Sequence, residues 1–386
     1  MDQKRIVVLG ATGSIGRQTL ELVRQHTPRL RVVGLAARSR VAELLAQAAE
    51  FGVGTICLLD GEAAAAAQTE WEGRGKVLCG AEGLCELVVG TEADLVVGAM
   101  SGVAGLEPVL TALEAGIDVA LANKEPLVAA GGLVREAQAR GGAALLPVDS
   151  ELSAIFQCLQ GQATKAVARI WLTASGGPLA GHTAEQLAAV TPEEALAHPT
   201  WRMGPKVTVD SATLMNKGFE VFETRWLFDV DFDRIEVVVH PQSIVHSLVE
   251  FVDGSLLAQL GLPDMRLPIQ YALFYPERVP SDLPRLDLAA QQRLTFGPPD
   301  PDRFPCLRLA YEAGRQGLSY PVALNAADEV AVEAFLCGAI GFMDIPALIE
   351  ATLERHMPSV PDSLDAVRAA DEAARRQAAG LAGVAA

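Results

Sequence analysis

Two carboxylates and a serine stand together where an apolar segment ends, at Asp149, Ser150 and Glu151. In extended backbone, alternate residues point the same way, so the two carboxylates would share one side of the chain. With room for a third oxygen ligand, such a pair suits Mg²⁺ or Mn²⁺ better than zinc. A plainer interpretation stays open, because Asp149 or Ser150 can cap a following helix while Glu151 favours the helix dipole.

A polar stripe with helical spacing begins near Asp210. Its members recur at i, i+3, i+4 and i+7, and they are Thr213, Asn216, Lys217 and Glu220. The pattern predicts one helix from Asp210 onward, with Asp210 and Ser211 as residues of the N-cap type. Free N–H groups at its start and a lysine further along suit an anion such as phosphate. A capped core helix with a solvated polar edge explains the same pattern.

The segment in front of that stripe, His198–Pro205, has the composition of a lid. Its prolines and its glycine disfavour regular structure, while Trp201 and Met203 offer apolar cover. A lid beside an anion-binding helix is a coherent active-site arrangement. The alternative is that Trp201 simply packs onto its own domain.

The elements that must position these residues begin with a dinucleotide-type turn. A short β-branched strand, Arg5–Leu9, leads into Gly10-Ala-Thr-Gly-Ser-Ile-Gly16, and helical periodicity follows over Arg17–Gln25. A G-x-x-G-x-x-G pattern between strand and helix predicts a nucleotide site whose pyrophosphate sits on the helix N-terminus. A tight turn without a ligand is the alternative.

A basic segment follows the second strand, which is predicted over Leu30–Ala36. Arg38, Ser39 and Arg40 stand where an NAD enzyme usually has a carboxylate for the ribose hydroxyls. Two arginines and a serine favour the 2′-phosphate of NADP instead, unless they are ordinary solvated loop residues.

Strands and helices continue to alternate as far as Val148, which predicts an α/β fold with a Rossmann-like, doubly wound parallel sheet. The predicted strands are Thr55–Leu59, Asp94–Ala99, Ile117–Ala122 and Ala143–Val148, and the predicted helices are Glu62–Gln68 and Leu106–Glu114. Asn123, Lys124 and Glu125 follow one of these strands at its carboxyl end, where open α/β sheets bind ligands. They are therefore candidate site residues, although Lys124 also fits a surface position at a helix start.

The rest of the chain predicts a central α+β domain followed by helices. A strand over Arg169–Thr173 runs into Ser175-Gly-Gly-Pro178, whose hydroxyl and N–H groups suit phosphate or form only a turn. Hairpin-like strands follow up to Leu260, before a proline-rich linker. The helices predicted beyond it are Cys306–Arg315, Ala323–Leu336, Ile345–Glu354 and Ser363–Ala379. The predicted domains are 1–149 for NADP, 150–279 for catalysis with the lid near 197–205, 280–305 as linker, and 306–386 as a helical bundle.

Composition narrows the function classes. The chain has 386 residues, 50% hydrophobic content and a formal charge of −17, which indicates folded domains and argues against nucleic acid or an anionic membrane as main partner. Its six cysteines show neither a C-x-x-C pair nor metal-ligand spacing, which indicates core thiols in a reducing compartment. With no apolar run of transmembrane length and no signal sequence before the first strand, we expect a cytoplasmic protein.

The motifs occur in one order along almost the whole chain. The series is GATGSIG, LANKE, VDSE, SGGP, HP-x-W-x-MG, VDSAT-x-MNKG-x-E, HPQSIVHS, LAQLG-x-PDMR and ALNAADE. It resembles the 1-deoxy-D-xylulose 5-phosphate reductoisomerase family. The resemblance implies an enzyme that uses NADPH and a divalent metal, Mg²⁺, Mn²⁺ or Co²⁺. Its implied reaction rearranges 1-deoxy-D-xylulose 5-phosphate by retro-aldol and aldol steps, then reduces the branched aldehyde to 2-C-methyl-D-erythritol 4-phosphate, in non-mevalonate isoprenoid precursor synthesis. A homodimer through the central domain is also implied.

The resemblance further implies a role for individual residues. The implied metal ligands are Asp149, Glu151 and Glu220; the implied substrate contacts are Ser175, Ser211, Asn216 and Lys217 at the phosphate, Ser150 and Lys124 at the sugar, and the lid residues His198, Trp201 and Met203. The implied cofactor contacts are Thr12, Gly13, Ser14, Ile15, Arg38, Ser39, Asn123, Glu125 and Gly204. Lys124, His198 and the three carboxylates are the implied catalytic residues. Lys217 and Glu220 would stand one helical turn, about 5 Å, apart and so serve the two ends of the substrate.

Three positions depart from the pattern of that family. Leu152 stands where many members have histidine, Pro126 where serine is common, and Thr200 where asparagine is usual. The first puts in doubt an essential histidine at that place, but none of the three is an implied metal or phosphate ligand. Two other function classes stay open. Another NADP-dependent dehydrogenase, acting on a small phosphorylated or semialdehyde substrate, would need a reactive cysteine or a base dyad, and a non-enzymatic NADP-binding regulator would not need three carboxylates.

Overall fold

The structure is a computed structural model that describes residues 3–384, and the chain groups into two compact units. The first unit comprises the chain up to Pro126 together with Gly132–Ser153 and Asp264–Leu283. The second comprises Leu127–Gly131, Ala154–Pro263 and the chain from Pro284 onward. The division into four segments expected from the sequence stays a prediction.

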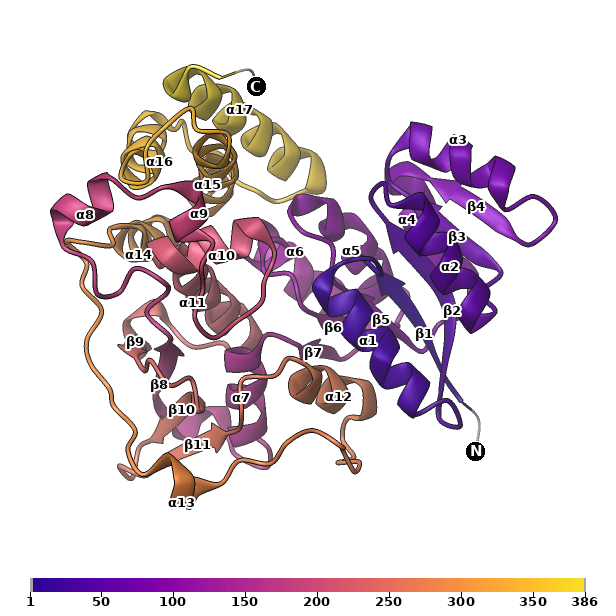
Figure 1. Ribbon diagram of the computed structural model, residues 1–386, viewed down its shortest axis with the longest axis horizontal. Coiled ribbons are helices and arrows are strands. Elements are labelled where there is room, and N and C mark those ends of the chain that lie inside the picture. Colours follow the sequence, from indigo (N-terminus) through magenta and orange to yellow (C-terminus); the bar gives the residue numbers. More distant parts are fainter. Residues whose placement is uncertain (1–2, 385–386) are drawn as a thin grey trace. The chain divides into compact units, whose positions relative to one another are not determined.

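A seven-stranded, fully parallel sheet forms the centre of the first unit (Figure 1). Its strands are β1 (Lys4–Leu9), β2 (Leu30–Ala37), β3 (Thr55–Leu58), β4 (Lys76–Cys79), β5 (Leu95–Gly98), β6 (Asp118–Leu121) and β7 (Leu145–Pro147), in the order β4-β3-β2-β1-β5-β6-β7. β1 and β5 are almost continuously apolar and buried, as expected for strands covered on both faces. The predicted doubly wound α/β fold is confirmed.

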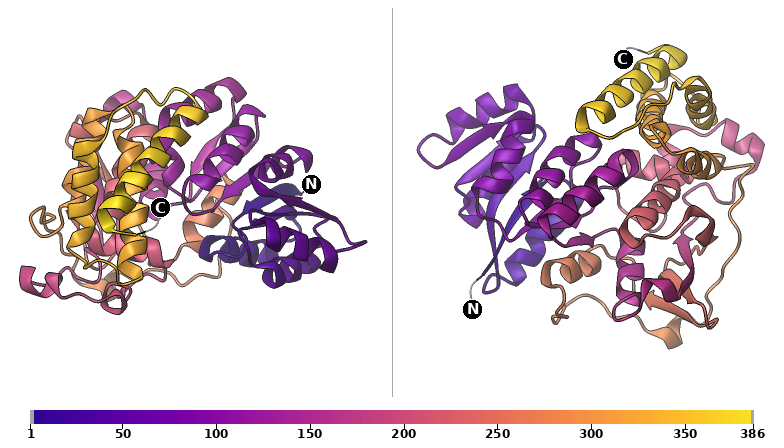
Figure 2. Two further views of the ribbon diagram at one scale, coloured as in Figure 1. Left: turned by 90° about the horizontal axis from the view of Figure 1, so that it is seen from above. Right: turned by 180° about the vertical axis from the view of Figure 1, so that it is seen from behind.

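Helices lie on both faces of this sheet (Figure 2). They are α1 (Ser14–Gln25), α2 (Val41–Phe51), α3 (Gly61–Glu70), α4 (Gly80–Gly90), α5 (Leu106–Glu114), α6 (Glu125–Gly141) and α12 (Arg266–Phe274), with a 3₁₀ turn, η1 (Val103–Gly105). The sequence patterns did not predict β4, α2, α4 or α12. α12 returns from far along the chain to pack against α1, and Arg266 pairs there with Glu21 at 2.6 Å.

The second unit contains a four-stranded mixed sheet in the order β11-β10-β8-β9. Its strands are β8 (Val167–Ala174), β9 (Ile235–Val239), β10 (Val245–Phe251) and β11 (Leu256–Leu260). β8 and β9 are parallel, whereas β10 and β11 form the expected antiparallel hairpin. β11 is therefore one edge of the sheet, and β9 is the other.

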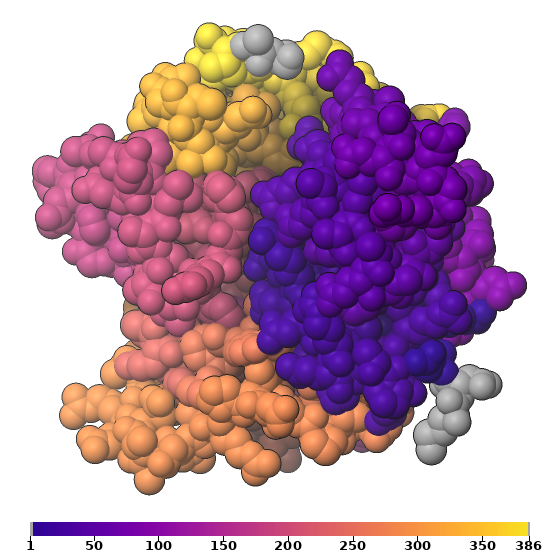
Figure 3. Space-filling view, turned by 45° about the vertical axis from the view of Figure 1, so that its right-hand side comes forward, coloured from indigo at the N-terminus to yellow at the C-terminus, as the bar shows by residue number. Residues whose placement is uncertain are grey.

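The remaining helices belong to the second unit, in whole or in part. They are α7 (Ser150–Cys158), which crosses from the first unit into the second, α8 (Ala184–Ala188), α9 (Pro192–Ala195), α10 (Pro205–Thr213), α11 (Met215–Phe228), α13 (Leu288–Gln291), α14 (Cys306–Gln316), α15 (Tyr320–Leu336), α16 (Asp344–Arg355) and α17 (Leu364–Ala382), with 3₁₀ turns η2 (Thr164–Ala166) and η3 (Phe232–Arg234). Within the second unit, the yellow C-terminal helices and the orange segment near residue 290 lie on opposite sides of the pink segment around residues 180–200 (Figure 3). Within the described part of the chain, no helix combines the length and apolar character needed to span a bilayer.

The single helix predicted from Asp210 onward is wrong, because the chain breaks at Leu214. α10 begins at Pro205 with Gly204 as N-cap and ends at Thr213, and α11 begins at Met215. Leu214 adopts a left-handed conformation with φ of 62°, which costs a side-chain-bearing residue about 1–2 kcal/mol. Its side chain is buried, and that burial offsets the cost. Asp210 and Ser211 consequently lie in the last turns of α10 and do not cap a helix.

Candidate active site

The turn after β1 is shaped for a close backbone approach. Gly10 has a φ of +84°, and a Cβ there would lie 2.3 Å from the carbonyl oxygen of Ala99. A Cβ on Gly16 would lie 2.3 Å from the carbonyl oxygen of Gly10. α1 then starts at Ser14 with Gly13 as N-cap, and no side chain caps its first N–H groups. This is the arrangement that accepts a pyrophosphate at a helix N-terminus.

The position of this turn in the sheet also favours a ligand. The strand order reverses direction between β1 and β5, and open α/β sheets bind ligands beside such a point, at the carboxyl ends of the strands. Asn123 lies there after β6 and is buried; its Nδ2 donates to the carbonyl oxygen of Gly102 at 3.5 Å. Its Oδ1 has no hydrogen-bond partner among the described residues, so a buried acceptor faces this end of the sheet. Glu125, also buried, begins α6 next to it.

The basic segment after β2 lies beside the same turn. Arg38 and Ser39 are exposed, as a contact for a bound phosphate requires. The neighbouring Arg40 donates from Nη1 to the carbonyl oxygen of Thr12 at 3.0 Å. Arg40 thus ties the segment to the glycine turn, a contact that spacing alone did not indicate.

Asp149 and Glu151 do not lie in extended backbone, so that predicted geometry is wrong. α7 begins at Ser150, and the carbonyl oxygen of Asp149 accepts from the N–H of Ser153 at 2.8 Å, which makes Asp149 the helix-capping residue. The carboxylates of Asp149 and Glu151 nevertheless offer oxygens within 4.8 Å of each other. Oδ2 of Asp149 also accepts from Nζ of Lys124 at 2.6 Å, and Ser150 donates its hydroxyl to Glu151.

In the second unit, the first turns of α11 hold a buried polar group. Glu220 accepts from Nδ2 of Asn216 at 2.7 Å and, on its other oxygen, from the ammonium of Lys217. The side chains of Lys217 and Glu220 are only 4% and 1% exposed, so water screens their attraction little. Lys217 and Glu220 lie one helical turn apart on α11, as predicted, and their side chains are in direct contact.

His198 contacts Ser175, the serine that follows β8. The imidazole Nε2 lies 3.2 Å from Oγ of Ser175, while Nδ1 accepts from the N–H groups of Thr200 and Trp201 at 3.1 and 2.9 Å. Because Nδ1 acts as an acceptor, the neutral ring carries its proton on Nε2 and donates to the serine. Burial lowers the pKa of His198, which also favours the neutral ring.

The glycines after Ser175 bring this loop against α10. Gly177 has a φ of +71°, and a Cβ there would lie 2.5 Å from the carbonyl oxygen of Ser211. The N–H of Gly177 donates to Oγ of Ser175 at 3.2 Å. Ser175 and Ser211, predicted from different motifs, therefore belong to adjoining segments.

The lid residue Trp201 packs near a residue that the sequence patterns did not single out. Its ring centroid lies 6.3 Å from that of His246 on β10, with the planes tilted by 57°. His246 is buried. It belongs to the HPQSIVHS motif, and this motif is the sequence feature that could have identified it as a site residue. Met203 is half-buried, and Gly204 is an exposed residue at the start of α10.

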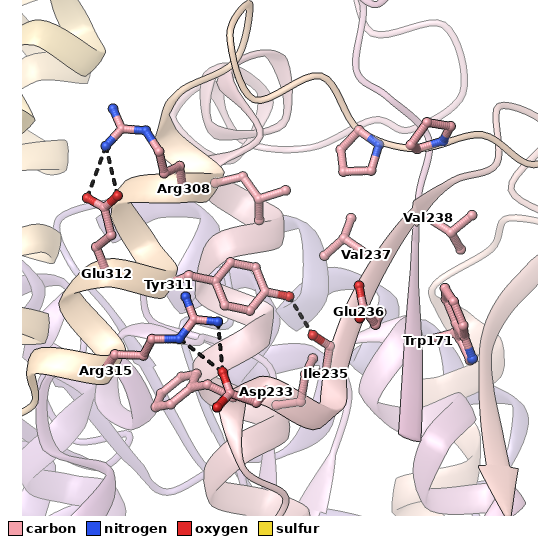
Figure 4. A pocket seen from close by; sticks show the side chains of 14 residues that line it. Trp171, Asp233, Ile235, Glu236, Val237, Val238, Arg308, Tyr311, Glu312 and Arg315 are labelled. Carbon is pink, nitrogen blue, oxygen red and sulfur yellow. Dashed lines mark hydrogen bonds and ion pairs between the residues drawn. The ribbon is translucent and has the colours of Figure 1, made fainter. Parts of the chain in front are cut away.

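A cavity of about 580 Å³ elsewhere in the second unit contains none of the predicted residues (Figure 4). It lies between β9, α14 and the prolines at 298 and 299. Its charged groups are paired: Arg308 with Glu312, Arg315 with Asp233, and Glu236 with Arg169. It offers no free charge to a phosphorylated ligand and is not a candidate for the site.

A parallel sheet whose central strand ends in a pyrophosphate-type turn, with a basic segment after the next strand, defines an NADP-dependent oxidoreductase of the α/β class. The chain also matches domain families described as 1-deoxy-D-xylulose 5-phosphate reductoisomerase over residues 6–131, its C-terminal domain over 145–228, and the DXP reductoisomerase C-terminal domain over 260–377. A 1-deoxy-D-xylulose 5-phosphate reductoisomerase of Heliobacterium modesticaldum is 57% identical over 97% of this chain and 96% of the relative. One of Thermomicrobium roseum is 53% identical over 98% and 97%. The chain belongs to the 1-deoxy-D-xylulose 5-phosphate reductoisomerase family, as the motifs predicted.

Solved structures agree with this assignment. The reductoisomerase of Zymomonas mobilis in complex with NADPH is 42% identical, with a TM-score of 0.92 over 99% of both chains. A DOX-P reductoisomerase in complex with NADPH, fosmidomycin and magnesium is 41% identical, with a TM-score of 0.93 over 98% of both chains.

Proposed function

We propose that this chain converts 1-deoxy-D-xylulose 5-phosphate to 2-C-methyl-D-erythritol 4-phosphate, using NADPH and a divalent metal ion. The observation that carries the proposal is a pair of buried lysine–carboxylate contacts, Lys124 with Asp149 and Lys217 with Glu220, on a chain of this family. Carboxylates suit a hard cation, and ammonium groups suit the anionic ends of a sugar phosphate. The carboxylates therefore fit the metal ion, and the lysines fit the anionic sugar phosphate.

The metal ligands in this proposal are Asp149, Glu151 and Glu220. Asp149 and Glu151 offer oxygens within 4.8 Å of each other at the start of α7, and Glu220 is the third ligand in this proposal. An all-oxygen donor set fits Mg²⁺, Mn²⁺ or Co²⁺. When bound, the cation supplies a Lewis acid that stabilises the negative charge developing as the carbon–carbon bond breaks.

The phosphate of the substrate binds to Ser175, Ser211, Asn216 and Lys217, and its sugar end to Ser150 and Lys124. Lys217 then turns from Glu220 toward the phosphate, which frees the carboxylate for its other role. The neutral His198 holds the hydroxyl of Ser175 through Nε2. The lid segment that contains His198 and Trp201 excludes water, so that the aldehyde formed in the first step is reduced before it escapes.

The cofactor contacts lie in the first unit, apart from Gly204. Thr12–Ile15 bind the pyrophosphate through the free start of α1, and Arg38 with Ser39 bind the 2′-phosphate. Asn123 and Glu125 lie on the nicotinamide side, where the unpaired Oδ1 of Asn123 offers an acceptor. When bound, NADPH supplies the hydride for the second step.

Three of the six cysteines are unsuited to a semialdehyde dehydrogenase mechanism, whereas Cys79 and Cys337 are exposed and so are not the core thiols that the sequence predicted. Burial raises the pKa of Cys57 to about 12 and that of Cys158 to about 11, and it raises the pKa of the fully buried Cys306 as well. These thiols stay protonated at neutral pH and are poor nucleophiles.

The chain acts as a homodimer in this proposal. β11 is an edge strand whose Leu256, Leu257 and Leu260 are exposed, and Val252 at the end of the same hairpin is exposed too. An exposed apolar edge strand is a template for pairing with another chain. A second copy that pairs through β11 would cover these side chains.

Turnover of NADPH tests the function directly. Purified protein mixed with NADPH and 1-deoxy-D-xylulose 5-phosphate should oxidise the nicotinamide, and a chelator such as EDTA should abolish the oxidation until Mg²⁺ or Mn²⁺ is restored. Identification of 2-C-methyl-D-erythritol 4-phosphate by mass spectrometry completes the test. If Mg²⁺, Mn²⁺ and Co²⁺ all failed to support oxidation of NADPH, the proposal would be contradicted.

A further inference from the structure

Lys206 connects the start of α10 to the middle of α15, within the second unit. Its ammonium donates to Oδ2 of Asp210 at 2.7 Å and to Oδ2 of Asp328 at 2.6 Å. Lys206 and Asp210 are one turn apart on α10, whereas Asp328 lies 122 residues beyond Lys206 on a C-terminal helix. α10 and α15 pack against each other at this point.

Joining two helices through this network costs the free energy of removing charged groups from water. The side chain of Asp328 is fully buried, and burial raises the pKa of its carboxyl while Lys206 opposes that rise. The carboxyl of Asp210 faces that of Asp328, and Oδ1 of the neighbouring Asn325 has no hydrogen-bond partner within residues 3–384. Buried ion pairs with unsatisfied atoms contribute little net stability compared with apolar side chains of similar volume. The stability of the fold therefore does not account for the network. The network instead fixes the position of α10 relative to α15.

The residues around Lys206 include the segments that face the substrate. The predicted lid segment, His198–Pro205, runs into the first residue of α10, so the position of Lys206 fixes where that segment joins the helix. The ammonium of Lys206 also lies 4.9 Å from the centre of the Phe219 ring, and Phe219 precedes Glu220 on α11. One side chain thus touches α10, α11 and α15.

We propose that Lys206 and Asp328 form a positioning lock, through which the C-terminal helices hold the lid segment and the start of α11 in the arrangement that binds the phosphorylated substrate. The proposal rests on the proposed function. Neither residue is catalytic, because each acts through the segments it anchors. The lock gives the helical bundle its main part in substrate affinity, and Gly204 is the one proposed cofactor contact that it touches.

The test removes all three charges of the network at once. In the triple variant Lys206→Met, Asp210→Leu and Asp328→Leu, apolar side chains replace the buried group, so the protein should fold with a melting temperature near that of the unmodified chain. Its KM for 1-deoxy-D-xylulose 5-phosphate should rise on the order of tenfold, while the Kd for NADPH changes by a smaller factor. Lys206→Met alone should raise KM as well, with a lower melting temperature, because Asp210 and Asp328 lose their cation.

The control breaks an ion pair that joins two other helices of the same bundle. Nη2 of Arg308 on α14 donates to Oε1 of Glu350 on α16 at 2.9 Å, and Arg308 also pairs with Glu312 on its own helix. The double variant Arg308→Met with Glu350→Leu should keep the KM of the unmodified chain. An unchanged KM in both Lys206 variants would overturn the lock, and so would an equal rise in the control. Turnover by the unmodified chain tests the proposed function separately.

Discussion

In the proposed site, the buried carboxylate of Glu220 binds Lys217 in one state and the metal ion in the other. An ionised carboxylate that is 1% exposed needs partners on both oxygens, and Asn216 and Lys217 provide them from the preceding turn of α11. Removing one partner of such a buried pair is costly, whereas exchanging a lysine for a cation keeps the charge satisfied. The local contacts therefore hold the proposed metal ligand in place and still allow Lys217 to be exchanged for a cation.

Glu220→Gln tests that role. The amide keeps the size and can still accept from Lys217, but it lacks the negative charge that a divalent cation needs. We expect metal-dependent turnover to fall on the order of 10²-fold, with the Kd for NADPH nearly unchanged, as steady-state kinetics and fluorescence titration would measure.

Glu223→Gln is the matched control, since Glu223 is equally buried on the same helix but is not a proposed ligand. Turnover of this variant should stay close to that of the unmodified chain. If Glu220→Gln lost NADPH binding and turnover to the same degree, Glu220 would have a structural role only.

The types of the residues and the order of the motifs along the chain were sufficient to predict most of the candidate site residues. The glycine turn was predicted with its strand and helix, and the structure has them. The contacts of individual side chains could not be predicted in the same way, because they depend on segments far apart in sequence. The hydrogen bond from Arg40 to Thr12 and the ring contact of Trp201 with His246 are examples.

The break between α10 and α11 illustrates the limit at the scale of elements. The spacing of the polar stripe is helical across the break, and the sequence has neither glycine nor proline at Leu214, the residue that carries the unfavourable φ. Tertiary burial of that leucine overrides its local preference, which no pattern in a single segment reveals. β4, α4 and α12 were missed for a related reason, because short or irregular apolar patterns give weak periodic signals.

Gly218 lies at a close contact between α11 and α14. A Cβ at Gly218 would lie 2.5 Å from the Cβ of Ala310, which is itself buried. Although alanine is the better helix former, Gly218→Ala should lower the free energy of unfolding by about 1–3 kcal/mol, because the two helices must separate. Thermal or urea unfolding measures this change, and turnover should fall with it as Lys217 and Glu220 shift.

Gly380→Ala is the control for helix propensity. Gly380 lies near the end of α17, and a Cβ there would meet no atom within 4 Å. The free energy of unfolding should rise by about 0.5–1 kcal/mol, since nothing opposes the propensity of alanine. A stabilised Gly218→Ala variant would show that α11 and α14 have room to adjust.

At the scale of the whole molecule, alternation of strands and helices was sufficient to predict the parallel sheet and the bundle of α14–α17. The boundaries of the compact units were harder to predict, because the chain leaves the first unit and later comes back to it. The segment 264–283 groups with the first unit although it follows the second sheet in sequence, and α7 runs from one unit into the other. Order along the chain does not reveal such returns.

The exposed edge of β11 makes a prediction about assembly. The side chains of Leu256 and Leu260 are 53% and 37% exposed, and a strand edge with such residues favours pairing with a second chain. Sedimentation velocity should give the mass of two chains for the unmodified protein. Leu256→Lys combined with Leu260→Lys should shift it toward the mass of one chain, because charged edge residues oppose pairing. Leu288→Lys, at an equally exposed leucine on α13, should leave the dimer intact. A single-chain mass for the unmodified protein, or a dimer that survives both lysines on β11, would contradict this assignment of the interface.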